Sequence, residues 1–149
     1  MTTFNSAVAE VLGSAYGRAE RAKLLVDLIR AARGFHWVGL YDVSATHISA
    51  LAWTGDRSPV FPVVPIDQGL NGAAVASGEP VIVQDVSQDS RYPTTLFATR
   101  AEAIFPVLGQ DGNKVVGTID IESDRVDAFA PDDVAFLSEC AVLMRPLWG

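Results

Sequence analysis

The chain has 149 residues, of which 49% are hydrophobic and 19% charged, a composition that suits one compact domain with a single core. Its 18 acidic and 11 basic residues give a formal net charge of −7 at pH 7. This acidic balance argues against a nucleic-acid partner, and no apolar run is long enough to cross a bilayer. Because no signal-peptide pattern follows Met1, we expect a cytoplasmic protein without a membrane partner, organised as a single domain over residues 1–149.

Helical spacing of apolar side chains is strongest at the two ends of the chain. The predicted helices lie at 4–13, around 24–32, at 73–77 and from Pro131 onward. Gly34 is placed to end the second helix, because glycine tolerates the positive φ of a C-cap. The turn at 69–72 leads into the third helix, and Pro131 suits the first turn of the last one.

Between the helices, β-branched and aromatic residues gather in short runs that are typical of strands. The predicted strands lie at 36–41, 48–53, 60–66, 81–83, 103–108 and 115–121. Prolines within 60–66 place that run at a sheet edge, and Asp111-Gly112 predicts a hairpin between the last two strands. Segment 85–101 is irregular, with a helical turn expected around 95–100. This order of elements predicts an α+β fold, an antiparallel sheet with the terminal helices on one face.

Three carboxylates interrupt apolar strands and are candidates for a binding site. Alternation places Asp120 and Glu122 on one face of their strand, together with Thr118. The hairpin brings Glu102, on the preceding strand, within reach of either acid. Together they would form a seat for a cation or an ammonium group. A solvated strand face is the alternative, and alternation alone favours it unless segment 85–101 covers the same face.

Aromatic residues form a second candidate set. Trp37 and Tyr41 share a face of one strand, and Trp53 lies on its neighbour. Core packing is the common role of such residues, although they also serve as walls of a cation-binding pocket.

Other reactive residue types give no catalytic pattern. His36 and His47 have no carboxylate at ligand spacing, so we expect no metal site, and Cys140 lies on the apolar face of the last helix as an inert core thiol. The turn at 69–72 matches no phosphate-binding pattern, and no serine lies in a nucleophile elbow. The residues alone therefore indicate a small ligand-binding domain with no visible catalyst.

Several short motifs, in this order and spacing, resemble those of a GAF domain over nearly the whole chain. They are Trp37-Val38-Gly39-Leu40-Tyr41, Gly69-Leu70-Asn71-Gly72-Ala73-Ala74, Gly78-Glu79-Pro80-Val81-Ile82-Val83-Gln84-Asp85-Val86, Ile104-Phe105-Pro106-Val107, Val116-Gly117-Thr118-Ile119-Asp120-Ile121-Glu122-Ser123 and Phe129-Ala130-Pro131-Asp132-Asp133. The resemblance implies an antiparallel sheet of about six strands, with the terminal helices on one face and a ligand pocket on the other.

Within that family the chain looks most like the free methionine-R-sulfoxide reductases. Their tryptophan strand matches Trp37 and Tyr41, their Ser-Glu-Ile-x-x-Pro strand appears as Ala101–Pro106 with Glu102, and their acidic pair corresponds to Asp120 and Glu122. In that family these acids and the tryptophan help to bind the substrate.

The family's cysteines are where this chain departs from the pattern. Those reductases use cysteines on the pocket rim, and the matching positions here are Phe61, Asn71 and Thr95. We therefore expect no catalytic residue, no metal and no cofactor. The expected ligand-binding residues are Trp37, Tyr41, Asn71, Thr95, Glu102, Asp120 and Glu122.

Three hypotheses follow for function. The leading one is a sensor or regulatory domain that binds an amine-bearing or cationic metabolite, with a signalling partner in trans. A diverged reductase-like enzyme and a dimerising structural module are the alternatives. Apolar residues at 4–13 and 143–148 predict a homodimer in which the terminal helices meet.

Overall fold

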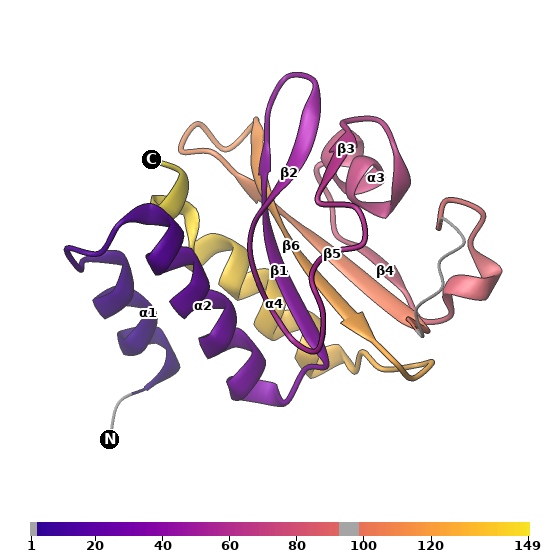
Figure 1. The fold of residues 1–149 in the computed structure, drawn as a ribbon, viewed down its shortest axis with the longest axis horizontal. Helices are drawn as coiled ribbons and strands as arrows, with labels where there is room; N and C mark the ends of the chain where they lie inside the picture. Colours follow the sequence, from indigo (N-terminus) through magenta and orange to yellow (C-terminus); the bar gives the residue numbers. More distant parts are fainter. Residues whose placement is uncertain (1–2, 93–98) are drawn as a thin grey trace.

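The computed structural model describes residues 3–92 and 99–149, and within them six strands form one antiparallel sheet in the order β3-β2-β1-β6-β5-β4 (Figure 1). The strands are β1 (Trp37–Val43), β2 (His47–Thr54), β3 (Val63–Pro65), β4 (Val81–Val83), β5 (Ala101–Leu108) and β6 (Val115–Ser123). The run with prolines forms the edge strand β3, as its sequence predicts. The predicted α+β fold is therefore confirmed.

Helices and short 3₁₀ turns surround this sheet. They are α1 (Phe4–Leu12), α2 (Arg18–Arg33), α3 (Gly69–Ser77), α4 (Pro131–Leu143), η1 (Val86–Gln88) and η2 (Arg145–Trp148). Gly34 ends α2 with φ 68°, the left-handed conformation that glycine adopts without strain. At the start of α4 the carboxylate of Asp133 accepts a hydrogen bond from the backbone N–H of Ala130, at 3.0 Å.

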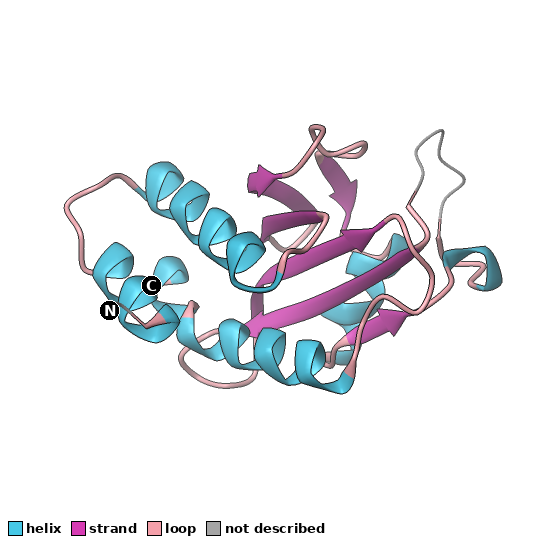
Figure 2. Ribbon diagram, turned by 90° about the horizontal axis from the view of Figure 1, so that it is seen from below, coloured by secondary structure: helices cyan, strands magenta, loops and turns pink. Residues whose placement is uncertain are grey.

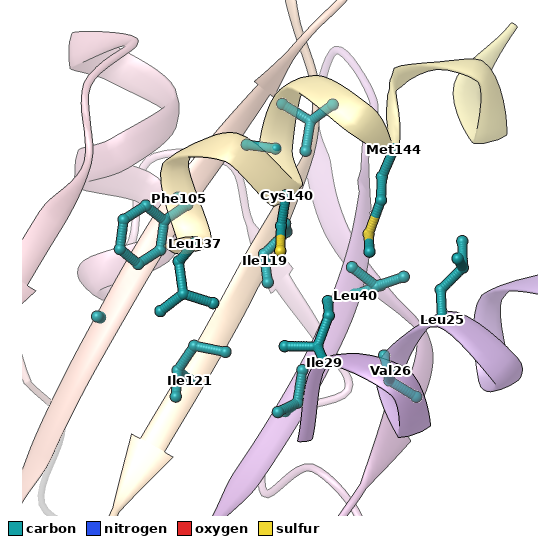
Figure 3. Packing of buried hydrophobic residues seen from close by; sticks show 14 of the residues in the cluster. Leu25, Val26, Ile29, Leu40, Phe105, Ile119, Ile121, Leu137, Cys140 and Met144 are labelled. Atoms are coloured by element: carbon teal, nitrogen blue, oxygen red, sulfur yellow. The ribbon is translucent and has the colours of Figure 1, made fainter. Parts of the chain in front are cut away.

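The main core lies between the sheet and the helices α2 and α4 (Figures 2 and 3). Leu40, Ile119 and Ile121 face this side from the strands. They pack against residues of α2 and α4 that follow the helical period, namely Leu25, Val26, Ile29, Leu137, Cys140 and Met144. Helix α1 lies alongside α2 (Figure 1), and no described helix is long and apolar enough to span a membrane.

The opposite face of the sheet carries α3 and two smaller clusters. Leu70 and Ala74 of α3 pack on Ile104 of β5, while Trp37 and Tyr41 pack together on β1. The terminal helices cover one face of the sheet, as the sequence predicts.

Two details differ from the sequence predictions, and a third lies largely outside the described residues. Helix α3 begins at Gly69 instead of residue 73, which places Asn71 in its first turn. Met144 and Leu147 are buried in the core, so the C-terminal residues do not add the exposed apolar surface that we expected. The helical turn expected around 95–100 falls largely on residues outside the described part of the chain.

Candidate functional site

Strand register brings the three predicted acids together on the face of the sheet opposite α2 and α4. Glu102 of β5 lies directly across from Glu122 of β6, because the β5–β6 hairpin pairs these two positions. In the hairpin turn, Oδ1 of Asp111 accepts hydrogen bonds from the backbone N–H groups of Asn113 and Lys114, and these bonds fix that register. Asp120 follows on the same face, two residues before Glu122.

Burial separates these acids from an ordinary polar strand face. Glu102, Asp120 and Glu122 keep only 8%, 3% and 9% of their surface exposed. One carboxylate oxygen from each acid lies within 4.8 Å of the others. The alternative of a solvated strand face is therefore wrong for these three residues.

Beside the acids, two aromatic side chains of β1 pack over a glycine of the same strand. Gly39 of β1 pairs with Asp120 of β6, and the rings of Trp37 and Tyr41 lie over Gly39 from either side. A Cβ atom at Gly39 would lie 2.6 Å from Cη2 of Trp37 and 3.1 Å from Cε1 of Tyr41, so this position has no room for a side chain.

Arg57, in the loop between β2 and β3, provides a cation inside the site. Its Nη2 lies 2.8 Å from Oε1 of Glu122 and 3.2 Å from Oγ1 of Thr99. Thr99 donates a second hydrogen bond to the same Glu122 oxygen, at 2.7 Å. The guanidinium also lies over the ring of Trp37, 5.5 Å from its centroid. Glu122 is therefore already charge-compensated within the protein.

Asp120 is held from one side by the first turn of α3. Thr118 donates a hydrogen bond to Oδ1 of Asn71 at 2.6 Å, which directs the amide nitrogen of Asn71 toward Oδ2 of Asp120, at 3.2 Å. Oδ1 of Asp120 is buried and accepts no hydrogen bond from a nitrogen or hydroxyl group among the described residues, so a protonated Glu102 is the one donor within its reach there. A buried carboxylate oxygen without a donor is costly, so this atom marks where a proton or a cation would be held.

Burial and mutual repulsion shift the titration of this cluster. Burial raises the pKa of Asp120 to about 7, and repulsion from Glu122 adds to that effect. Burial likewise raises the pKa of Glu102 well above its usual value, with further contributions from Asp120 and Glu122. A proton on Glu102 can be shared with Asp120 through a hydrogen bond between the two side chains. The pKa of Tyr41 is also raised well above its ordinary value, first by burial and then by the three acids.

The acids open into a cavity of about 90 Å³, small by comparison with drug-binding pockets. Its described lining residues are Tyr41, Val60, Phe61, Val64, Gln68, Gly69, Leu70, Asn71, Tyr92, Glu102, Asp120 and Glu122. The oxygen-rich acids are a donor set that hard divalent cations prefer, but the guanidinium of Arg57 already occupies one side of Glu122.

The structure brings together most of the predicted binding residues. Tyr41, Asn71, Glu102, Asp120 and Glu122 line the cavity, whereas Trp37 is fully buried beneath Arg57 and is not among the lining residues. Thr95 lies outside the described residues.

Arg57 and Thr99 were missed by the sequence analysis. Arg57 stands in a loop that carries no recognisable motif, and the only signal was its position shortly after a strand with aromatic residues. The fold also places His36 3.5 Å from Asp56 and 3.9 Å from Asp124, two acids that are distant from it in the sequence.

Cys140 is the only cysteine of the chain and lies on the other side of the sheet from the acids. Figure 3 shows its sulfur among the core residues under α4. Burial raises the pKa of its thiol to about 12, so it stays protonated at neutral pH. The prediction of a core thiol is therefore confirmed.

Comparison with known proteins identifies the family. The sequence model of the GAF domain matches residues 18–144. The chain belongs to the GAF domain family. The site described above thus occupies the face of a GAF domain opposite its terminal helices.

Among proteins of known activity, this GAF domain is similar to the free methionine-R-sulfoxide reductase of Saccharomyces cerevisiae, with 27% identity over 111 residues. That match covers 74% of this chain and 61% of the yeast protein, so the chain spans less than two thirds of its relative.

Solved structures give the same picture of the fold. The type II free methionine-R-sulfoxide reductase of Thermoplasma acidophilum is 28% identical, with a TM-score of 0.80 over 87% of this chain and 91% of that one. The GAF domain of an Acinetobacter phosphoenolpyruvate-protein phosphotransferase superposes with a TM-score of 0.84 over 97% and 89% of the two chains. It is only 15% identical, so that likeness concerns the fold alone.

Proposed function

We propose that this GAF domain is a sensor or regulatory module that binds a small amine-bearing or cationic metabolite and performs no catalysis of its own. The observation that carries the proposal is Asp120, a buried carboxylate whose Oδ1 accepts no hydrogen bond from a nitrogen or hydroxyl group among the described residues and which lines the cavity. An ammonium group supplies both the positive charge and the hydrogen-bond donor that this oxygen needs.

The charges around the cavity favour the binding of one ammonium group. Arg57 neutralises Glu122, and the raised pKa of Glu102 favours its protonated form, so Asp120 carries the remaining negative charge. Tyr41 offers an aromatic wall beside this carboxylate, which suits a cation, and Phe61 and Val60 provide an apolar rim for the rest of the ligand. On this reading the ammonium group competes with a proton for the carboxylate of Asp120, while Glu102 keeps its own proton.

The regulatory part of the proposal rests on the residue types at the cavity. No thiol or imidazole lies among the described lining residues, so the cavity offers none of the thiol redox chemistry of a cysteine-dependent reductase. A domain that binds a ligand without converting it acts by changing its interaction with a partner when the ligand is bound. The proposal therefore includes a signalling partner in trans, in the cytoplasm.

A diverged reductase is the second candidate, because two of the similar proteins at 27–28% identity are free methionine-R-sulfoxide reductases. The protonated, buried thiol of Cys140 argues against it. Incubation of the purified protein with free methionine-R-sulfoxide and dithiothreitol or thioredoxin is expected to give no turnover above a control without protein. Turnover that disappears in Cys140→Ala would favour the reductase.

A titration of binding tests the leading proposal. Calorimetry with a series of primary alkylamines and free amino acids is expected to find ligands that bind the native protein and lose affinity in Asp120→Asn. The matched control is Asp132→Asn, because Asp132 is an exposed carboxylate in the first turn of α4 on the other side of the sheet. If no amine binds, or if Asp120→Asn binds as well as the control, the amine pocket is wrong.

A further inference from the structure

We propose that Arg57 sets the charge selectivity of the pocket: its guanidinium fills the cation position beside Glu122, so the pocket accepts a ligand with one positive charge and excludes one with two. This inference rests on the proposed amine-binding function and assigns a residue that decides which amines are taken.

The first observation is that Arg57 occupies the position beside Glu122 that a second cationic group of a ligand would need. Its Nη2 lies 2.8 Å from Glu122, in the position where a donor from a second ammonium group would lie. Both side chains are largely shielded from solvent, at 15% and 11% exposure. Because water screens this pair poorly, the positive charge of Arg57 acts strongly on anything that enters the cavity beside it.

The second observation is that Arg57 is held in this position through its own backbone. The indole N–H of Trp37 donates a hydrogen bond to the carbonyl oxygen of Arg57, at 2.9 Å. Two residues earlier, Gly55 has φ 144°, and a Cβ there would lie 2.5 Å from Cδ1 of Trp37. The loop is therefore fitted closely around the indole, and the guanidinium reaches Glu122 from a fixed base.

The third observation is the difference between the two acids of β6. Glu122 has two donors, Arg57 and Thr99, on a single oxygen, whereas Oδ1 of Asp120 accepts no hydrogen bond from a nitrogen or hydroxyl group among the described residues. The protein's own cation thus occupies the position beside Glu122, whereas the position beside Oδ1 of Asp120 can still take a ligand's ammonium group. A dication would need both seats and would have to displace Arg57, which would leave a second positive charge in the same buried space.

Removing the guanidinium should open the second seat. In Arg57→Gln, Glu122 keeps its place but loses its counter-charge, so the pocket gains room and negative charge for a second ammonium group. We expect butane-1,4-diamine to bind this variant about tenfold or more tightly than it binds the native protein, because a buried unpaired carboxylate is costly. Butylamine should also bind the variant more tightly, but by a smaller factor than the diamine, because it carries one positive charge instead of two.

The experiment measures both probes by calorimetry on the native protein, Arg57→Gln and two controls. In Arg57→Gln/Glu122→Gln the second seat is removed, and the gain for the diamine should disappear. In Arg18→Gln a comparable arginine–carboxylate pair is broken on the other face of the sheet, and the ratio of the two affinities should stay at the native value. A purely structural role of Arg57 would not move this ratio.

Two results would overturn the inference, and they are distinguishable. If butylamine binds but Arg57→Gln leaves the ratio unchanged, the charge-selectivity role is wrong while the amine pocket stands. If neither probe binds any of the proteins, the amine pocket is wrong and this inference goes with it. Should Arg57→Gln not fold, Arg57→Met keeps the unbranched stem over Trp37 and is expected to give the same gain for the diamine.

Discussion

Each face of the sheet carries one group made of an arginine, a tryptophan and a carboxylate. The members are Arg57, Trp37 and Glu122 on the pocket face and Arg18, Trp148 and Asp42 on the helix face. In both groups the guanidinium lies over the indole ring, 5.5 and 5.9 Å from its centroid, and pairs with the carboxylate at 2.8 and 2.6 Å. Both tryptophans lie against glycines that leave space for the ring.

The two groups differ in burial. The charged side chains of the pocket group are 15% and 11% exposed, whereas Arg18 and Asp42 are 38% and 39% exposed. Water screens the outer pair, which serves to tie η2 to the sheet through the hydrogen bond from Trp148 to Asp42. The same three residue types therefore have different roles on the two faces. The exposed group attaches the C-terminal turn to the sheet, whereas the buried group places a poorly screened charge beside the cavity.

The largest contrast is expected when the two arginines lose their charge. Arg57→Gln leaves Glu122 largely buried without a counter-charge and should lower the free energy of unfolding by about 3 kcal/mol. Arg18→Gln breaks a pair that water screens and should cost less than about 1 kcal/mol. Urea denaturation of both variants checks this, and equal losses would show that burial is not what separates the groups.

A smaller contrast is expected at the glycines under the two indoles. Gly39→Ala would place a methyl group 2.6 Å from Trp37, which is fully buried, so overpacking should cost about 2–3 kcal/mol. Gly117→Ala would place one 2.4 Å from Trp148, but this ring is only partly buried, in the C-terminal turn η2. The expected cost there is about 1 kcal/mol. Thermal melts of the two variants measure the difference, and a larger loss in Gly117→Ala would reverse the comparison.

The carboxylates should respond with opposite signs. Folding raises the pKa of Asp120 to about 7, so the folded state binds more protons than the unfolded chain and stability falls as the pH rises from about 4 to 7. Asp120→Asn abolishes this fall in stability and should raise the free energy of unfolding of the ligand-free protein by about 1–2 kcal/mol at pH 8. The same variant should no longer bind amines. Asp42→Asn, which removes the partner of Arg18, should destabilise the protein by less than about 1 kcal/mol.

Melting curves between pH 4 and pH 8 test these signs. The melting temperature of the native protein should fall as the pH rises through this range, and that of Asp120→Asn should fall by a smaller amount. Amine affinity should fall as the pH drops below about 7, since Asp120 then binds a proton. A native melting temperature that rises steadily from pH 4 to pH 7 would contradict the raised pKa.

The smallest expected effect concerns assembly. We predict a homodimer through the terminal helices, and exposed Tyr16 and Val142 lie on that side of the molecule. Light scattering at tens of micromolar should give twice the chain mass of 15.9 kDa, and an added amine should leave that mass unchanged, because the pocket opens on the other face. A mass of one chain would contradict the dimer.

Strand periodicity was enough to predict the fold and most of the acid cluster. Alternation in β6 placed Asp120 and Glu122 on one face, and the Asp-Gly turn fixed the register that brings Glu102 to them. These are local properties with short sequence separations, so a single sequence contains them.

Arg57 could not be predicted in the same way. It meets Glu122 across 65 residues of sequence, from a loop whose course depends on how the indole of Trp37 packs against Gly55. The sequence also gave no indication that Trp37 would lie beneath an arginine rather than at the cavity wall. Side-chain contacts of this kind depend on tertiary packing and leave no periodic signal.

The double contact between Trp37 and Arg57 has an optical consequence. The indole N–H is held by the carbonyl oxygen of Arg57 while the guanidinium lies over the ring, so any displacement of this arginine changes both the polarity and the hydrogen bonding of one fully buried fluorophore. Trp53, at 37% exposure, emits from a wetter environment. The blue edge of the emission band therefore reports whether the loop has moved, without any added label.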